Sequence, residues 1–88
     1  MEDSAPNGES MITVTHNGPD KEFPYRPKEL VEVLLALAKV AFGVANQHLL
    51  GLFTENGLEL IDKESLESQG VRAEQLLVLR QSEVRGGA

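Results

Sequence analysis

Cysteine is absent from the sequence, and so is tryptophan. Without cysteine the chain forms no disulfide, no thiolate metal site and no nucleophilic thiol of its own. Small domains from oxidising compartments often depend on disulfides, so this absence favours the cytoplasm. No basic segment followed by an apolar run opens the chain, so we expect no signal peptide. The longest apolar stretch, residues 30–44, is too short to cross a bilayer and contains Glu32 and Lys39, so we expect no membrane partner.

Basic residues are scarce as well. Eight Lys and Arg stand against 14 Asp and Glu, which gives a net charge of −6. Because phosphate binding needs clustered Lys and Arg, we expect no nucleic-acid partner. The opening "MEDSAPNGES" holds Glu2, Asp3 and Glu9 but almost nothing to bury. Residues 1–10 are therefore predicted to form a disordered acidic leader.

Aromatic residues are few, with three Phe and one Tyr, so the core must be built from aliphatic side chains. The hydrophobic fraction of 41% is normal for a globular domain. A chain of 88 residues supports one domain with a small core. We place that domain at residues 11–80.

The first part of the domain has the pattern of a β-hairpin. In "MITV" the β-branched Ile12 and Val14 alternate with polar residues, which is typical of a strand. Asn17 and Gly18 favour a turn. The following "EFPYR" places Phe23 and Tyr25 on one face, although the proline between them favours a short or edge strand.

Residues 27–43, "PKELVEVLLALAKVAFG", carry the strongest helix signal, with proline suited to the first turn and glycine to the end. Three- and four-residue spacing predicts one buried stripe, made of Leu30, Leu34, Leu37, Ala38 and Ala41. Further apolar residues lie beside this stripe: Val31, Val33, Leu35 and Val40. They fit either a second contact surface, for a dimer or a partner protein, or a more deeply buried helix.

The rest of the chain predicts a strand at residues 49–54, a turn at 55–57, a short strand at 58–61, a helical turn at 65–68 stopped by Gly70, and a last strand in "QLLVLR". The order is hairpin, helix, strand, short strand, strand. We therefore expect an α+β fold of two layers, in which a four- to five-stranded mixed sheet packs on one main α-helix and the last strand lies beside the first.

This order and several segments resemble ubiquitin. The ending "LVLR" followed by "RGG", the segment "GLFTENGLEL" and the opening "MITV" carry the likeness, which covers residues 11–87. The resemblance implies a ubiquitin-like β-grasp protein, divergent from ubiquitin. The Leu- and Ala-rich helix and the acidic leader are also similar to a bacterial ubiquitin-like family encoded beside its own activating and conjugating enzymes. Two departures stand out: residues 81–84 lengthen the tail, and Ala88 follows the second glycine.

The resemblance also implies a function as a protein modifier. A processing peptidase would cut after Gly87 and remove Ala88, and an activating enzyme would use ATP to pass the glycine carboxylate to a cysteine. A conjugating enzyme would then transfer it to amines of target proteins. Gly86 and Gly87 lack Cβ atoms, so an extended tail (residues 81–88, expected to be flexible) fits a narrow channel. Arg80 and Arg85 would pair with carboxylates of the activating enzyme.

Two other functions remain open. A sulfur carrier would convert the Gly87 carboxylate to a thiocarboxylate, although such carriers usually end at the glycine itself. A plain interaction domain would make no use of the tail chemistry. We expect no enzyme, because no nucleophile accompanied by an acid and a base is apparent.

Ubiquitin-like domains usually bind partners through an apolar patch on the open face of the sheet. If Leu77 and Leu79 face the helix, period two directs Leu76 and Val78 outward. With Leu52 as their neighbour on the adjacent strand, they are predicted to form a partner-contact patch.

No cofactor or metal site is expected. His16 and His48 are isolated, without a ligand partner at suitable spacing. Asp62, Glu64 and Glu67 are interpreted as a solvated acidic surface, because no base or nucleophile accompanies them.

Overall fold

The computed structural model describes residues 10–84. The predicted acidic leader, apart from Ser10, therefore lies outside the described residues, as do the last four residues of the tail. The described part contains four strands, one α-helix and one short 3-10 helix. Their bounds are β1 Met11–Thr15, β2 Asp20–Pro24, α1 Val31–Ala41, β3 Leu50–Thr54, η1 Glu67–Gln69 and β4 Leu76–Gln81.

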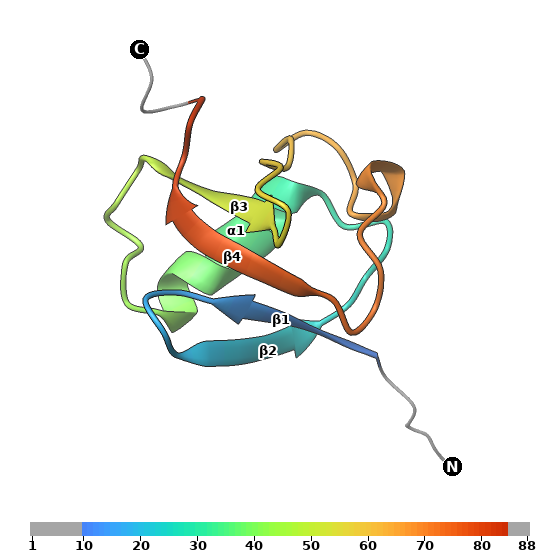
Figure 1. Cartoon of the computed structure of the whole chain (residues 1–88), viewed down its shortest axis with the longest axis horizontal. Helices are drawn as coiled ribbons and strands as arrows, with labels where there is room; N and C mark the ends of the chain where they lie inside the picture. Colours follow the sequence, from blue (N-terminus) through green and yellow to red (C-terminus); the bar gives the residue numbers. More distant parts are fainter. Residues whose placement is uncertain (1–9, 85–88) are drawn as a thin grey trace.

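The four strands form one mixed sheet in the order β2-β1-β4-β3 (Figure 1). The first two strands form the predicted hairpin, with Ile12 opposite Phe23. β4 runs parallel to β1, with Val14 opposite Leu77, and antiparallel to β3. The last strand therefore lies beside the first, as expected, and occupies the inside of the sheet.

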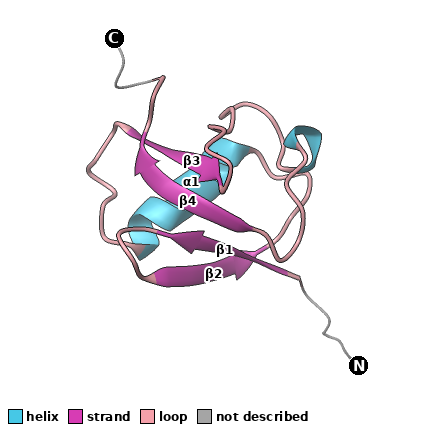
Figure 2. Ribbon diagram, viewed as in Figure 1, coloured by secondary structure: helices cyan, strands magenta, loops and turns pink. Residues whose placement is uncertain are grey.

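The helix α1 crosses one face of the sheet, and the loops connect the two layers at their ends (Figure 2). The two layers enclose an aliphatic core, to which each strand and the helix contribute. The order of elements and the two-layer α+β arrangement confirm the fold class expected from the sequence. Within residues 10–84, no helix has both the length and the apolar character that a membrane crossing needs.

The helix begins four residues later than the sequence predicts. Leu30 is extended, with φ −71° and ψ 146°, and forms a β-bridge to Ser65. The first helical amides, those of Val31 and Glu32, donate to the carbonyl oxygens of Glu64 and Asp62 at 2.9 and 3.1 Å. Because the loop around residues 61–65 satisfies these amides, the chain needs no further helical turn before Val31.

The buried side of α1 is rotated relative to the predicted stripe. The core receives Val31, Leu34, Leu35 and Ala38. The prediction was right for Leu34 and Ala38 but wrong for Leu37, which is 43% exposed, and for Ala41, which is exposed. Leu30 lies before the helix and is half-buried. Apolar residues occur on every side of this helix, so the sequence does not define which side is buried. Here the contact with the sheet determines the buried side.

Two smaller elements differ from expectation. The predicted strand at residues 58–61 is reduced to a single bridge between Phe53 and Glu59. The predicted helical turn appears as η1 and ends at Gly70, whose φ of 80° is in the left-handed region that glycine favours.

Candidate functional site

The candidate site begins with the alternation of side chains along β4. Leu77 and Leu79 are buried, with exposed fractions of 0% and 1%. Leu76 and Val78 point to the opposite face by period two and are half-buried. This face is the one that α1 leaves uncovered (Figure 1).

Leu52 does not belong to this face, so its predicted place in the patch was wrong. The β3–β4 register pairs Leu52 with Leu79, which places it on the helix side of the sheet, where it is 1% exposed. Its neighbour Phe53 pairs with Val78 and therefore takes the outward position. A one-residue difference in register exchanges the two faces of a strand, which explains the error.

Arg80 covers the ring of Phe53. The guanidinium carbon of Arg80 lies 3.5 Å from the ring centroid, the geometry of a cation–π contact. Its Nη1 also lies 3.7 Å from Oε2 of Glu83. Phe53 is consequently 0% exposed although it is on the open face. Leu76, Val78 and Arg80, with Phe53 beneath, are called the sheet-face patch below.

The rim of this patch is polar. Thr13 and Thr15 of β1 lie opposite Leu76 and Val78 in the parallel register, and both are half-buried. An apolar centre, a planar cation and two hydroxyl groups at one edge match the composition of protein-binding surfaces, where Arg and aromatic residues are enriched.

The chain leaves β4 through a set of hydrogen bonds centred on Ser82. The Ser82 amide donates to the Leu49 carbonyl at 2.7 Å, and its hydroxyl donates to Oε2 of Glu59 at 2.6 Å. The Glu83 amide donates to Oε1 of the same carboxylate at 2.9 Å, and the Val84 amide donates to the Ser82 hydroxyl at 3.0 Å. Ser82 is 3% exposed. We call this arrangement the tail anchor.

The tail anchor extends the folded part of the chain beyond the boundary predicted from the sequence. The sequence placed the domain boundary after Arg80, whereas β4 includes Gln81 and the next residue is buried. Of the predicted recognition residues, Arg80 is engaged with Phe53, and Arg85 lies outside the described residues. Gly86, Gly87 and Ala88, the predicted processing and conjugation residues, also lie outside them.

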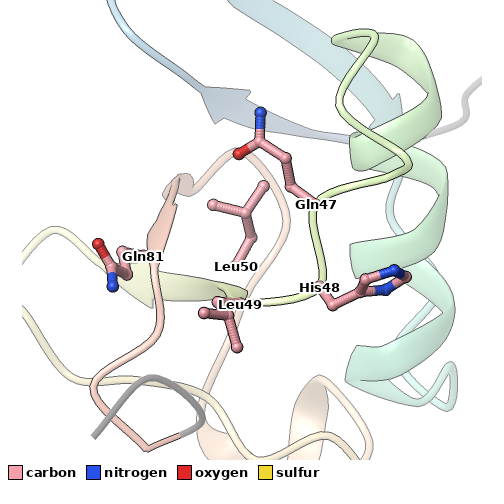
Figure 3. A pocket seen from close by; sticks show the side chains of 5 residues that line it. All are labelled: Gln47, His48, Leu49, Leu50 and Gln81. Carbon is pink, nitrogen blue, oxygen red and sulfur yellow. The ribbon is translucent and has the colours of Figure 1, made fainter.

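Two surface pockets lie near the end of β4. The first, of about 330 Å³, is lined by Gln47, His48, Leu49, Leu50 and Gln81. In Figure 3 the His48 and Gln81 side chains point away from each other, and Leu49 and Leu50 point to opposite sides. The second, of about 360 Å³, is lined by Glu59, Leu60, Ile61, Asp62 and Val84 beside the tail anchor. The polar groups of the first pocket do not converge as the polar groups of a small-molecule site do.

The histidines and acidic residues singled out from the sequence are dispersed. Nδ1 of His16 lies 2.9 Å from the Leu79 carbonyl oxygen, while His48 is exposed in the loop before β3. Glu64 accepts a bond from Ser68, and Glu67 pairs with Lys28. Within the described residues, no three His, Asp or Glu side chains are grouped as metal ligands.

Three residues of this region were missed by the sequence reasoning: Phe53, Glu59 and Ser82. The sequence does contain a signal for Phe53. It directly follows Leu52 in the same strand, and only one of two adjacent strand residues faces the helix. For Glu59 and Ser82 no signal was available, because the two residues are 23 positions apart and meet only through the folded sheet.

Comparison with solved structures supports the fold. A chain from the crystal structure of ATBAG1 in complex with HSP70 matches with a TM-score of 0.71 at 16% identity, over 89% of this chain. The match spans 43% of that chain, so this protein corresponds to less than half of its length. Neither a family model nor a curated protein sequence matches. The fold is the ubiquitin-like β-grasp, and at this identity the likeness carries the fold alone.

Proposed function

We propose that this protein is the precursor of a ubiquitin-like protein modifier. In this proposal a peptidase hydrolyses the bond between Gly87 and Ala88. An activating enzyme then transfers the AMP part of ATP to the Gly87 carboxylate with release of pyrophosphate, and a partner cysteine displaces the AMP to form a thioester. An amine of a target protein finally attacks the thioester, and the thiol leaves. The chain supplies the carboxylate and the binding surface, and the partner enzymes supply the catalysis.

The observation that carries the proposal is the pairing of this fold with this ending. The inner strand β4 of a β-grasp domain is followed closely in the sequence by Arg-Gly-Gly, which contains two residues without Cβ atoms. Counted from the tail anchor at Ser82, the five residues to Gly87 span at most about 17–18 Å when extended. That length suits an active site close to the domain that is being recognised.

The sheet-face patch provides the proposed docking surface for the partner enzymes and for proteins that read the modifier. Its centre is apolar, and the stacked Arg80 holds a planar cation in place before binding. Such preorganisation lowers the entropy lost on association. The guanidinium would present its remaining N–H groups to a carboxylate of the activating enzyme. Arg85 would add a second contact of the same kind.

The compartment follows from the chemistry. Activation consumes ATP and needs a reduced partner thiol, both of which are available in the cytoplasm. We propose that the modifier acts there, together with activating, conjugating and processing enzymes encoded beside it in a bacterial gene cluster.

The test is a reconstitution with those neighbouring enzymes and three forms of the chain. The full sequence should form adducts with other proteins only when the peptidase is present. A form that ends at Gly87 should form them without the peptidase, and a form that ends at Arg85 should form none under either condition. If the form ending at Gly87 remains unconjugated with an active activating enzyme, the modifier proposal is wrong.

The same assay separates the alternatives. A sulfur carrier would give a Gly87 terminus in which sulfur replaces one oxygen, and no protein adducts. An interaction domain would keep Ala88 and would bind partners through the sheet-face patch alone.

A further inference from the structure

The face of α1 that points away from the sheet carries an apolar stripe. Val33, Leu37 and Val40 are exposed by 44%, 43% and 68%. Ala36 lies between them and is also exposed. Because residues three, four and seven apart share a helix face, these four side chains form one continuous surface. The helix residues that the fold needs, including Leu34 and Leu35, lie on the opposite side.

Two opposite charges lie along one edge of this stripe. Glu32 and Lys39 are seven residues apart. This separation is a rotation of about 20° short of two full helical turns, so both residues lie on the same flank. The Glu32 side chain is 38% exposed and uses Oε1 to accept a 3.0 Å bond from Lys63. Lys39 has no ion-pair partner among residues 10–84.

We infer that α1 pairs with α1 of a second copy of this chain, in antiparallel orientation. A two-fold axis at right angles to the helices brings the same flank of each helix together and reverses the order of residues. With the axis beside Ala36, Glu32 of one copy lies level with Lys39 of the other within about 1.5 Å along the helix. A parallel pair would place opposite flanks together, so Glu32 of one copy would not meet Lys39 of the other.

The apolar residues satisfy the same symmetry. Val33 of each copy meets Val40 of the other, and the small Ala36 beside the axis allows the two backbones to approach closely. The ion pair between Glu32 of one copy and Lys39 of the other forms twice, because the interface is self-complementary. The charge order of the helix therefore selects a second copy over an unrelated apolar partner.

The size of the contact sets its strength. An α1 of 11 residues is about 16 Å long, so the interface falls below the roughly 1,200 Å² typical of stable complexes. The dimer is therefore weak and depends on concentration. Since α1 covers the inner face of the sheet, the sheet-face patches of both copies remain accessible on the outside, and the dimer is bivalent for a partner.

Sedimentation equilibrium of the full chain from about 10 µM to 1 mM tests the inference. Wild-type protein should associate to a dimer over this range. Glu32→Lys and Lys39→Glu should each weaken association about tenfold, because each dimer loses two ion pairs and gains two like-charge contacts. The double variant Glu32→Lys/Lys39→Glu should recover wild-type association.

Two controls separate the interface from other effects. Arg72→Glu makes the same charge change as Lys39→Glu at an exposed loop position, and it should leave association unchanged. Thermal unfolding of every variant verifies that the domain remains folded. A monomer at 1 mM, or a charge swap that fails to restore association, overturns the inference. Because no tail chemistry enters this assay, its outcome is independent of the modifier proposal.

Discussion

The composition of the proposed partner-binding face depends on which of two adjacent residues in β3 points into the core. Leu52 lies on the helix side opposite Leu79, and Phe53 lies on the open side opposite Val78. Arg80 then covers the Phe53 ring and replaces an exposed aromatic surface with a stacked cation. The chemistry offered to a partner is therefore an aliphatic pair beside a guanidinium.

Truncation of Leu52 and of Leu76 should have unequal effects on stability. Leu52→Ala should lower the free energy of unfolding by about 2–5 kcal/mol, because it opens a cavity in the core. Leu76→Ala should lower it by less than about 1 kcal/mol, since the side chain is half-buried on the open face. Urea unfolding of both variants measures the difference. Equal losses would mean that the faces of the sheet are assigned incorrectly.

The stack of Arg80 on Phe53 can be separated from its ion pair with Glu83. Arg80→Ala should lower the free energy of unfolding by about 0.5–1 kcal/mol through loss of the cation–π contact. Glu83→Ala removes only the exposed ion pair and should have a smaller effect. The Phe53 ring resonances in NMR spectra should shift in the first variant and stay in place in the second. A ring unaffected by Arg80→Ala would contradict the stacked geometry.

At the scale of elements, the order of strands and helix was predictable, but two details of their placement were not. Residues 30–40 carry apolar side chains in every direction, so their periodicity leaves the helix phase undetermined. The backbone carbonyls of Asp62 and Glu64, which cap the helix start, are far away in sequence. Likewise Leu49, Leu50 and Leu52 form a nearly continuous apolar run, so alternation could not assign the faces of β3.

The observed helix phase makes a prediction for two neighbouring leucines. Leu35 is 6% exposed and Leu37 is 43% exposed, while both lose the same helix propensity on replacement by alanine. Leu35→Ala should therefore lower the free energy of unfolding by about 2–5 kcal/mol, and Leu37→Ala by less than about 1 kcal/mol. Denaturant titrations of the matched pair check this order. A larger loss of stability for Leu37→Ala than for Leu35→Ala would mean that the buried stripe expected from the sequence is correct.

The tail anchor should protect amides beyond the end of β4 from hydrogen exchange. Ser82→Ala removes the hydroxyl that bonds Glu59 and should lower the free energy of unfolding by about 1–2 kcal/mol. Hydrogen exchange of the Glu83 and Val84 amides should also become faster, because their acceptors are lost or displaced. Ser68→Ala, at an exposed hydroxyl, is the matched control. If exchange at Val84 is already fast in the wild type, the anchor does not form in solution.

The whole molecule presents its two proposed surfaces on opposite sides. The sheet-face patch lies on the face that α1 leaves open, and the apolar stripe of α1 points the other way. In the proposed dimer, the sheet-face patch of each copy would therefore stay accessible to a partner. The α+β fold could be predicted from the sequence, whereas the membership of each surface required the register of β3 and the phase of α1.

In the proposed function, Gly87 becomes the point of attachment to other proteins. Tandem mass spectrometry of adducts formed with the neighbouring enzymes tests it most directly. We expect a branched peptide in which the Gly87 carbonyl is joined by an amide bond to an amine of a target protein and Ala88 is missing. Recovery of the chain only with Ala88 still attached, in the presence of active peptidase and activating enzyme, would contradict it.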